Sequence, residues 1–116
     1  MIKVETREIQ QYMLIDIKGE VDMYSSPQIR KILLEHISKK VSGLIVNLKA
    51  VSYMDSSGIA TLVESLQRLN EYGGKLIITN VQGAVMDVFE LSRLDKVFTI
   101  VDNESDALKE CDVVPR

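Results

Sequence analysis

A short and almost uninterrupted apolar run, residues 44–48 (LIVNL), constrains the fold of this chain more than any other feature. The run follows Gly43 and is too short for a membrane span or a typical helix. Such a run is typical of a central strand that is covered on both faces of a sheet. The apolar residues that follow it recur at helical spacing: Ile59, Leu62, Val63, Leu66 and Leu69. A buried strand followed by an amphipathic helix predicts an α/β fold with parallel strand pairs.

The same change between strand-like and helix-like periodicity recurs along the chain and predicts the order ββαβαβαβα. Residues 2–6 and 12–18 alternate apolar and polar side chains, as two half-buried strands of a hairpin do, with the turn over 7–11 and the exit from the sheet over 19–22. The remaining expected elements are a helix that starts at Ser25-Ser26-Pro27 with a serine N-cap, a loop over 49–54, a helix from Asp55 or Ser56 to the stop at Gly73-Gly74, a strand over 76–78, a helix over 82–91, a strand over 97–101 and a short helix capped by Asp102-Asn103. We therefore expect the fold class to be α/β, a mixed β-sheet packed by helices, in a single domain over residues 1–116.

Composition excludes several classes of protein. The 116 residues carry a formal net charge of −3 without a basic patch, which argues against a nucleic-acid partner. Cys111 is the only cysteine, so a disulfide within the chain is impossible, and we expect this residue to be a partly buried apolar one. The N-terminus has no apolar h-region, and no apolar run is long enough to cross a membrane. We expect a cytoplasmic protein that holds no metal and no cofactor.

Catalytic signatures are missing from the sequence. The hydrolase pattern GxSxG, the phosphate-binding loop and the dinucleotide-binding loop are all absent. His36 is the only histidine, and its spacing from Ile29, Ile32 and Leu33 predicts a packed or partly exposed position on the first helix. A general base also needs a nucleophile and an orienting group beside it. We therefore expect no catalytic residues and no enzymatic activity.

One segment, residues 51–60 (VSYMDSSGIA), joins the predicted central strand to the most regular predicted helix. The carboxyl end of a strand in an α/β sheet is a common place for a functional site. Asp and Ser at a helix start are also ordinary capping residues, so the residues alone leave both interpretations open. A phosphate on a serine here would lie near the positive end of the helix dipole and would add about −1.5 to −2 charges to the surface.

The segment 53–59 (YMDSSGI) resembles the phosphorylation motif of bacterial anti-sigma factor antagonists, which belong to the STAS domain family. Residues 19–22 (GEVD), the strand over 44–48 and residues 73–76 (GGKL) also resemble that family, and the likeness extends over the whole chain. Ala60 departs from the family pattern, in which many members have a second glycine.

The resemblance implies a partner-switching protein. Its unphosphorylated form would bind an anti-sigma factor that is itself a serine kinase and brings its own ATP and Mg²⁺, and this binding would release a sigma factor. Phosphorylation at Ser56 would end the binding, and a serine phosphatase would restore it. The matching positions imply a partner-binding surface, and we expect a monomer when the chain is free. This surface comprises Asp22, Met23, Tyr24, Met54, Asp55, Ser56, Ser57, Gly58 and Ile59.

The residues beside the serines leave one ambiguity. Met54 and Ile59 flank Ser56 and Ser57 and are either an apolar anchor for a partner or part of the core. The helical spacing favours the core for Ile59, whereas the pattern does not decide for Met54.

Three other functions are compatible with parts of the pattern. STAS domains also act as accessory subunits of transporters and as scaffolds of sensory complexes. A receiver domain phosphorylated on Asp55 would need further acidic residues after the first strand to hold Mg²⁺, where this chain has Gln10-Gln11. A serine hydrolase built on Ser56 or Ser57 would need a histidine, and His36 is poorly placed for that role.

Overall fold

The computed structural model describes residues 2–111 and confirms the predicted element order ββαβαβαβα. Its elements are β1 (Ile2–Ile9), β2 (Tyr12–Val21), α1 (Ser26–Ser38), β3 (Gly43–Met54), α2 (Ser56–Asn70), β4 (Lys75–Thr79), α3 (Gly83–Leu91), β5 (Thr99–Val101) and α4 (Glu104–Glu110). Within the described residues, none of these helices has the length and apolar character needed to cross a bilayer.

The strands form one mixed sheet in the order β1-β2-β3-β4-β5. β1 is antiparallel to β2, and all later neighbours are parallel. The predicted hairpin is present, but its turn contains only Gln10 and Gln11, because Ile9 already pairs with Tyr12. Both glutamines have positive φ angles, 48° and 71°, as a two-residue hairpin turn of this twist requires.

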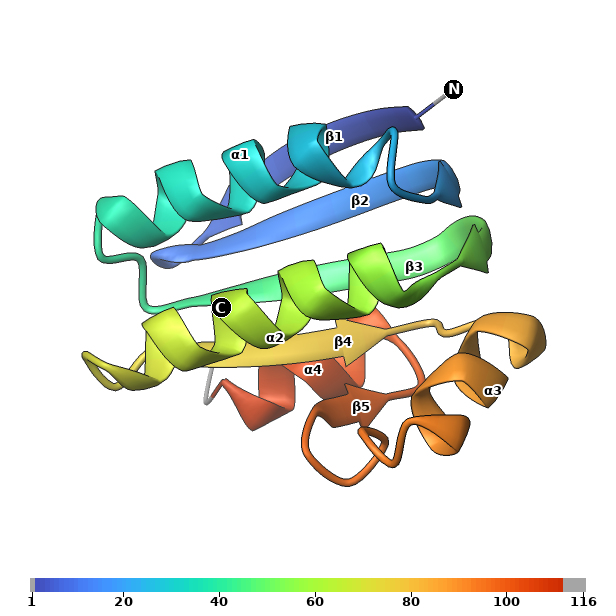
Figure 1. Ribbon diagram of the computed structural model, residues 1–116. Coiled ribbons are helices and arrows are strands. Elements are labelled where there is room, and N and C mark those ends of the chain that lie inside the picture. Colours follow the sequence, from blue (N-terminus) through green and yellow to red (C-terminus); the bar gives the residue numbers. More distant parts are fainter. Residues whose placement is uncertain (1, 112–116) are drawn as a thin grey trace.

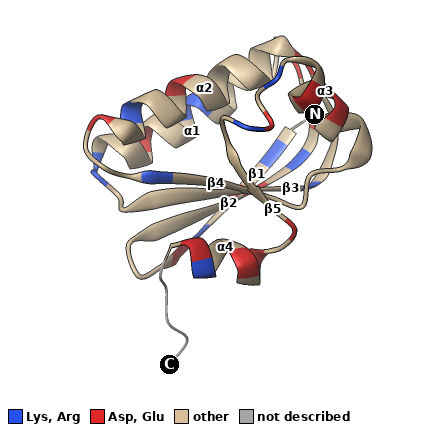
Figure 2. Cartoon of the chain, turned by 90° about the horizontal axis from the view of Figure 1, so that it is seen from below, with Lys and Arg blue, Asp and Glu red and all other residues tan. Residues whose placement is uncertain are grey.

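Helices cover the two faces of the sheet unequally. α1, α2 and α3 lie on one face and α4 alone lies on the other (Figures 1 and 2). β3 is the central strand, and its residues alternate between the two cores: Leu44, Val46 and Leu48 face the larger cluster and Ile45 faces the smaller one under α4. The prediction of a central strand covered on both faces is therefore confirmed.

Besides the hairpin turn, three predicted boundaries are wrong. Residues 49–54 are strand rather than loop, because β3 stays paired with β2 as far as the Val21–Met54 pair; β2 in turn continues to Val21 rather than leaving the sheet at residue 19. The last strand begins at Thr99 rather than Val97. Phe98, which precedes it, is buried and packs edge-on against Phe89, with 5.6 Å between the ring centroids.

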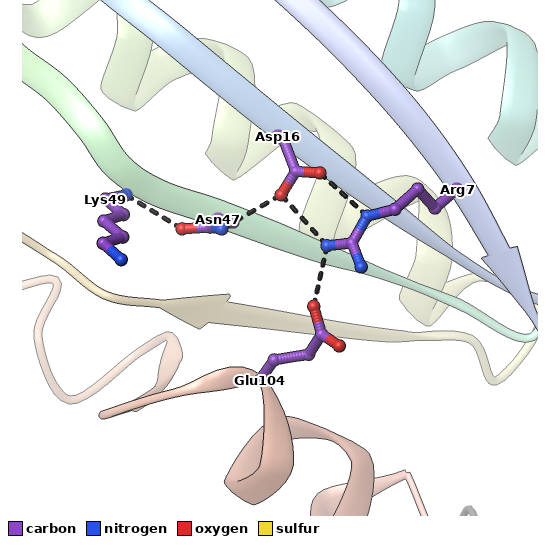
Figure 3. A network of polar contacts seen from close by, with 5 residues as sticks. All are labelled: Arg7, Asp16, Asn47, Lys49 and Glu104. Carbon is purple, nitrogen blue, oxygen red and sulfur yellow. Dashed lines mark hydrogen bonds and ion pairs between the residues drawn. The ribbon is translucent and has the colours of Figure 1, made fainter.

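A polar network fastens α4 to the sheet (Figure 3). Arg7 of β1 donates to Asp16 of β2 at 2.9 Å and to Glu104 of α4 at 2.7 Å, and Asn47 of β3 donates to Asp16 at 3.0 Å. The network thus connects three strands and the last helix. Its charged side chains are partly exposed, so we expect their ion pairs to stabilise the fold only modestly.

The central position of β3 leads to a stability prediction. Ile45→Ala would leave a cavity in the cluster under α4, so we expect the free energy of unfolding to fall by about 2–5 kcal/mol. Ile2→Ala, at a half-buried position of the edge strand β1, serves as the matched control and should cost less than about 2 kcal/mol. Urea denaturation of both variants measures the difference, and equal losses would contradict the central role of β3.

Candidate functional site

The carboxyl ends of β2 and β3 bring together the residues that the sequence separates into two candidate segments. Val21 pairs with Met54 at the end of the two strands, and the Asp55 amide donates to the Val21 carbonyl at 3.1 Å. α1 and α2 both begin at this end, on the right in Figure 1. The turn over residues 22–25 and the start of α2 therefore lie side by side.

Asp55 caps α2. Its Oδ1 accepts a hydrogen bond from the Ser57 amide at 2.9 Å and another from the Ser57 hydroxyl at 2.5 Å. Its backbone carbonyl accepts from the amides of Gly58 at 3.2 Å and Ile59 at 3.3 Å. The hydrogen bond from the Ser57 side chain, assisted by the backbone amides of Ser57, Gly58 and Met23, holds the pKa of the Asp55 carboxyl below its ordinary value. Asp55 therefore joins the start of α2 to the end of β2, because its side chain caps the helix and its amide bonds to Val21.

The two serines of the motif differ in their surroundings. Ser57 is half-buried and its hydroxyl is engaged by Asp55, whereas Ser56 is exposed. No other part of residues 2–111 forms a hydrogen bond with the Ser56 hydroxyl. Of the two hydroxyl groups, only that of Ser56 is both exposed and unengaged.

Asp22 organises the adjacent turn. Its Oδ1 accepts hydrogen bonds from the amides of Tyr24 at 2.9 Å and Ser25 at 3.0 Å. Ser25 does not cap α1 through its side chain, which corrects the prediction of a serine cap; its hydroxyl instead donates to the Glu20 carbonyl at 2.8 Å and accepts from the Asp22 amide at 3.0 Å. These bonds fix the backbone of the turn, from which the side chains of Met23 and Tyr24 project.

At this end of the sheet, the apolar side chains that are exposed differ from those that the sequence predicts. Met23 is 66% exposed and Tyr24 is 87% exposed. Met54 and Ile59 are 3% and 7% exposed, so they belong to the core and offer no surface anchor in the free chain. Sequence reasoning missed Tyr53, which is 49% exposed at the end of β3. The departure of β3 from strict alternation, with Ser52 and Tyr53 both exposed, hides this position from pattern analysis.

The structure does not combine the serines with a base. His36 is half-buried in the last turn of α1. It lies about 15 Å along the helix axis from Ser26, the residue at the end of α1 that is near the start of α2. Burial lowers the pKa of its imidazole. Among residues 2–111, no group of three or more His, Cys, Asp and Glu side chains is arranged to hold a metal ion. Cys111 is buried in the cluster under α4.

Comparison with known proteins places this chain in a family. The model of the STAS domain matches residues 3–107. The chain belongs to the STAS domain family. It is 28% identical to the anti-sigma F factor antagonist of Paenibacillus polymyxa over 114 residues, which are 97% of each chain. It is 30% identical to the anti-sigma-B factor antagonist of Staphylococcus aureus over 93 residues, 80% of this chain and 86% of that protein.

Solved structures support the same fold. A putative anti-sigma factor antagonist from Thermotoga maritima superposes with a TM-score of 0.90 at 19% identity and 94% coverage of both chains. The anti-sigma factor antagonist SpoIIAA in its unphosphorylated form gives a TM-score of 0.84 at 24% identity, with 98% of this chain and 100% of that chain covered. The predicted STAS-like α/β fold is thus confirmed.

Gly58 permits the close approach of α2 to the strand ends. A Cβ atom at this position would lie 2.7 Å from Cγ1 of Val21 and 2.8 Å from Cγ of Met54, both in the core. These distances are well below van der Waals contact, so a larger residue would move the first turn of α2 and with it Ser56.

We predict that Gly58→Ala destabilises the protein although alanine favours helix. The overpacking costs about 1–3 kcal/mol and exceeds the gain in helix propensity of about 1 kcal/mol. Gly83→Ala in the first turn of α3 is the matched control, because an added Cβ there meets nothing within 4 Å. Thermal unfolding should show a lower midpoint for Gly58→Ala only; a shared increase would refute the packing argument.

Proposed function

We propose that this chain is an anti-sigma factor antagonist whose unphosphorylated form binds an anti-sigma factor and whose binding ends when Ser56 is phosphorylated. The observation that carries this proposal is the contrast between the two serines at the start of α2. Ser56 presents an exposed hydroxyl that a kinase can reach, while the hydroxyl of Ser57 is held by Asp55.

The family supports the choice of partner. Relatives that align with most of this chain are named antagonists of anti-sigma F and anti-sigma-B factors. By analogy, the partner would be an anti-sigma factor with serine kinase activity that supplies ATP and Mg²⁺, and a serine phosphatase would reverse the modification. The chain itself would act as a cytoplasmic monomer and would not be an enzyme.

The geometry also supports a mechanism for the switch. The turn over residues 22–25 presents Met23 and Tyr24 to solvent beside the start of α2, and such large side chains are typical anchors of protein interfaces. A phosphate on Ser56 would add about −1.5 to −2 charges to this surface. A partner that packs closely on Met23 and Tyr24 would have to desolvate that charge, which would lower its affinity.

The partner-binding residues of this proposal are those at the surface. They are Asp22, Met23, Tyr24, Asp55, Ser56 and Ser57. Gly58, Met54 and Ile59 would act indirectly, because their burial supports the backbone on which Ser56 lies.

The proposal predicts a clear pattern of phosphorylation. When the purified protein is incubated with Mg-ATP and the anti-sigma factor kinase of its own organism, tandem mass spectrometry should locate phosphate on Ser56. Ser56→Ala should abolish the modification and retain binding, and Ser56→Asp should weaken binding at least several-fold as a partial mimic of phosphate.

Ser57→Ala is the matched control, since it removes the neighbouring hydroxyl and leaves the acceptor in place. It should still be phosphorylated, with a small loss of stability because Asp55 loses one of its hydrogen bonds. Phosphate on Ser57, or equal partner affinity of Ser56→Ala and Ser56→Asp, would overturn the assignment.

A further inference from the structure

The first turn of α2 already holds an anion. In most helices the amides of the first turn lack intrahelical partners and are available to a phosphate. In this chain the Ser57 amide donates to the Asp55 carboxylate and the Gly58 amide donates to the Asp55 carbonyl, which also accepts the ordinary helical bond from Ile59. Within residues 2–111, the Ser56 amide is the one donor of this first turn that has no acceptor. The simple expectation that a phosphate on Ser56 would be received by the helix N-terminus therefore needs revision.

The segments that form this place carry no positive charge of their own. The sequence contains no lysine or arginine between Lys18 and Arg30 or between Lys49 and Arg68, the stretches that include the turn over residues 22–25 and the start of α2. Arg30 and Arg68 are both paired with Glu64. Among residues 2–111, no ion pair involves Asp22 or Asp55.

We propose that Asp55 keeps a phosphate on Ser56 outside the N-terminus of α2, so that its full charge remains on the surface that meets the partner. This inference rests on the proposed phosphorylation of Ser56. The carboxylate occupies the Ser57 amide, and its negative charge repels a phosphate on the adjacent residue. Asp55 is thus a positioning residue that makes the phosphate effective as a signal.

The side-chain geometry of a helix supports this arrangement. Cα–Cβ bonds of helical residues tilt toward the N-terminus, so the side chain of Ser56 leans toward Asp55 and the turn that contains Asp22. A phosphate there faces the carboxylate of Asp55, which already occupies the Ser57 amide, so within the described first turn only the amide of Ser56 itself is left to receive it. The exposed side chains of Met23 and Tyr24 project from the same turn. The charge of the phosphate would therefore lie beside these proposed apolar anchors.

The test installs phosphoserine at position 56 of the full chain during synthesis, so it requires no kinase. The wild type, Asp55→Ala and Asp55→Asn are each prepared with serine and with phosphoserine at this position. Thermal unfolding and the amide proton shift of Ser57 in ¹H–¹⁵N NMR spectra are the two readouts.

In the wild type, phosphoserine should leave the Ser57 amide shift nearly unchanged and should leave the unfolding midpoint equal or lower. In Asp55→Ala the amide is vacant, so the phosphate should bind it, move the Ser57 proton strongly downfield and raise the midpoint by about 4 °C, the usual effect of regaining one helix cap in a domain of this size. Asp55→Asn keeps a neutral cap and provides the comparison if the alanine variant does not fold. In this variant phosphoserine should change the unfolding midpoint and the Ser57 amide shift in the same directions, by smaller amounts.

Two results would overturn the inference. A raised midpoint and a downfield Ser57 amide in the wild type would show that the phosphate displaces the carboxylate. Unchanged midpoints and amide shifts in both Asp55 variants would show that something other than Asp55 keeps the phosphate away. Neither result depends on whether a kinase modifies Ser56, so failure of this inference is distinguishable from failure of the proposed function.

Discussion

The burial of β3 on both faces is the constraint on which the rest of the structure depends. Leu44, Val46 and Leu48 face the layer of α1, α2 and α3, and Ile45 faces α4, so the strand must lie between two others and beneath helices on both sides. Because β3 and β4 are parallel, the chain must cross over between them, and α2 makes this crossover. The end of β3 therefore places the start of α2, and Ser56 with it, at an exposed border of the sheet.

The parts of the fold that follow from local chemistry were predictable from the sequence. The apolar run marks the central strand, and Asp55 and Asn103 both accept hydrogen bonds from the helices that they precede, as the capping rule predicts. The ends of β2 and β3 were not predictable, because their pairing contains register shifts next to Lys18 and Glu20 that disturb the alternation of side chains. Thr61 and Ser65 are buried although neither belongs to the apolar stripe of α2, because the packing of this helix covers more than that stripe.

The candidate site, like the fold, was predictable from the sequence only in part. The exposed position of Ser56 and the capping role of Asp55 follow from their place at the start of a helix. The burial of Met54 does not, because it depends on how closely α2 approaches β2 at Gly58, and that approach is a tertiary feature. The exposure of Tyr53 was likewise hidden, since the face to which a residue points after a register shift cannot be read from its neighbours in sequence.

The hydrogen bonds at this end of the sheet bear on the proposed charge-based switch. The turn held by Asp22 and the cap made by Asp55 satisfy most of the local backbone amides within the chain. The stretches 19–29 and 50–67, which include this surface, contain no lysine or arginine, so they offer a new phosphate few groups that could neutralise it. Under the proposed function, the energetic effect of phosphorylation would fall on the complex with the partner rather than on the fold, because only the complex would have to remove that charge from water.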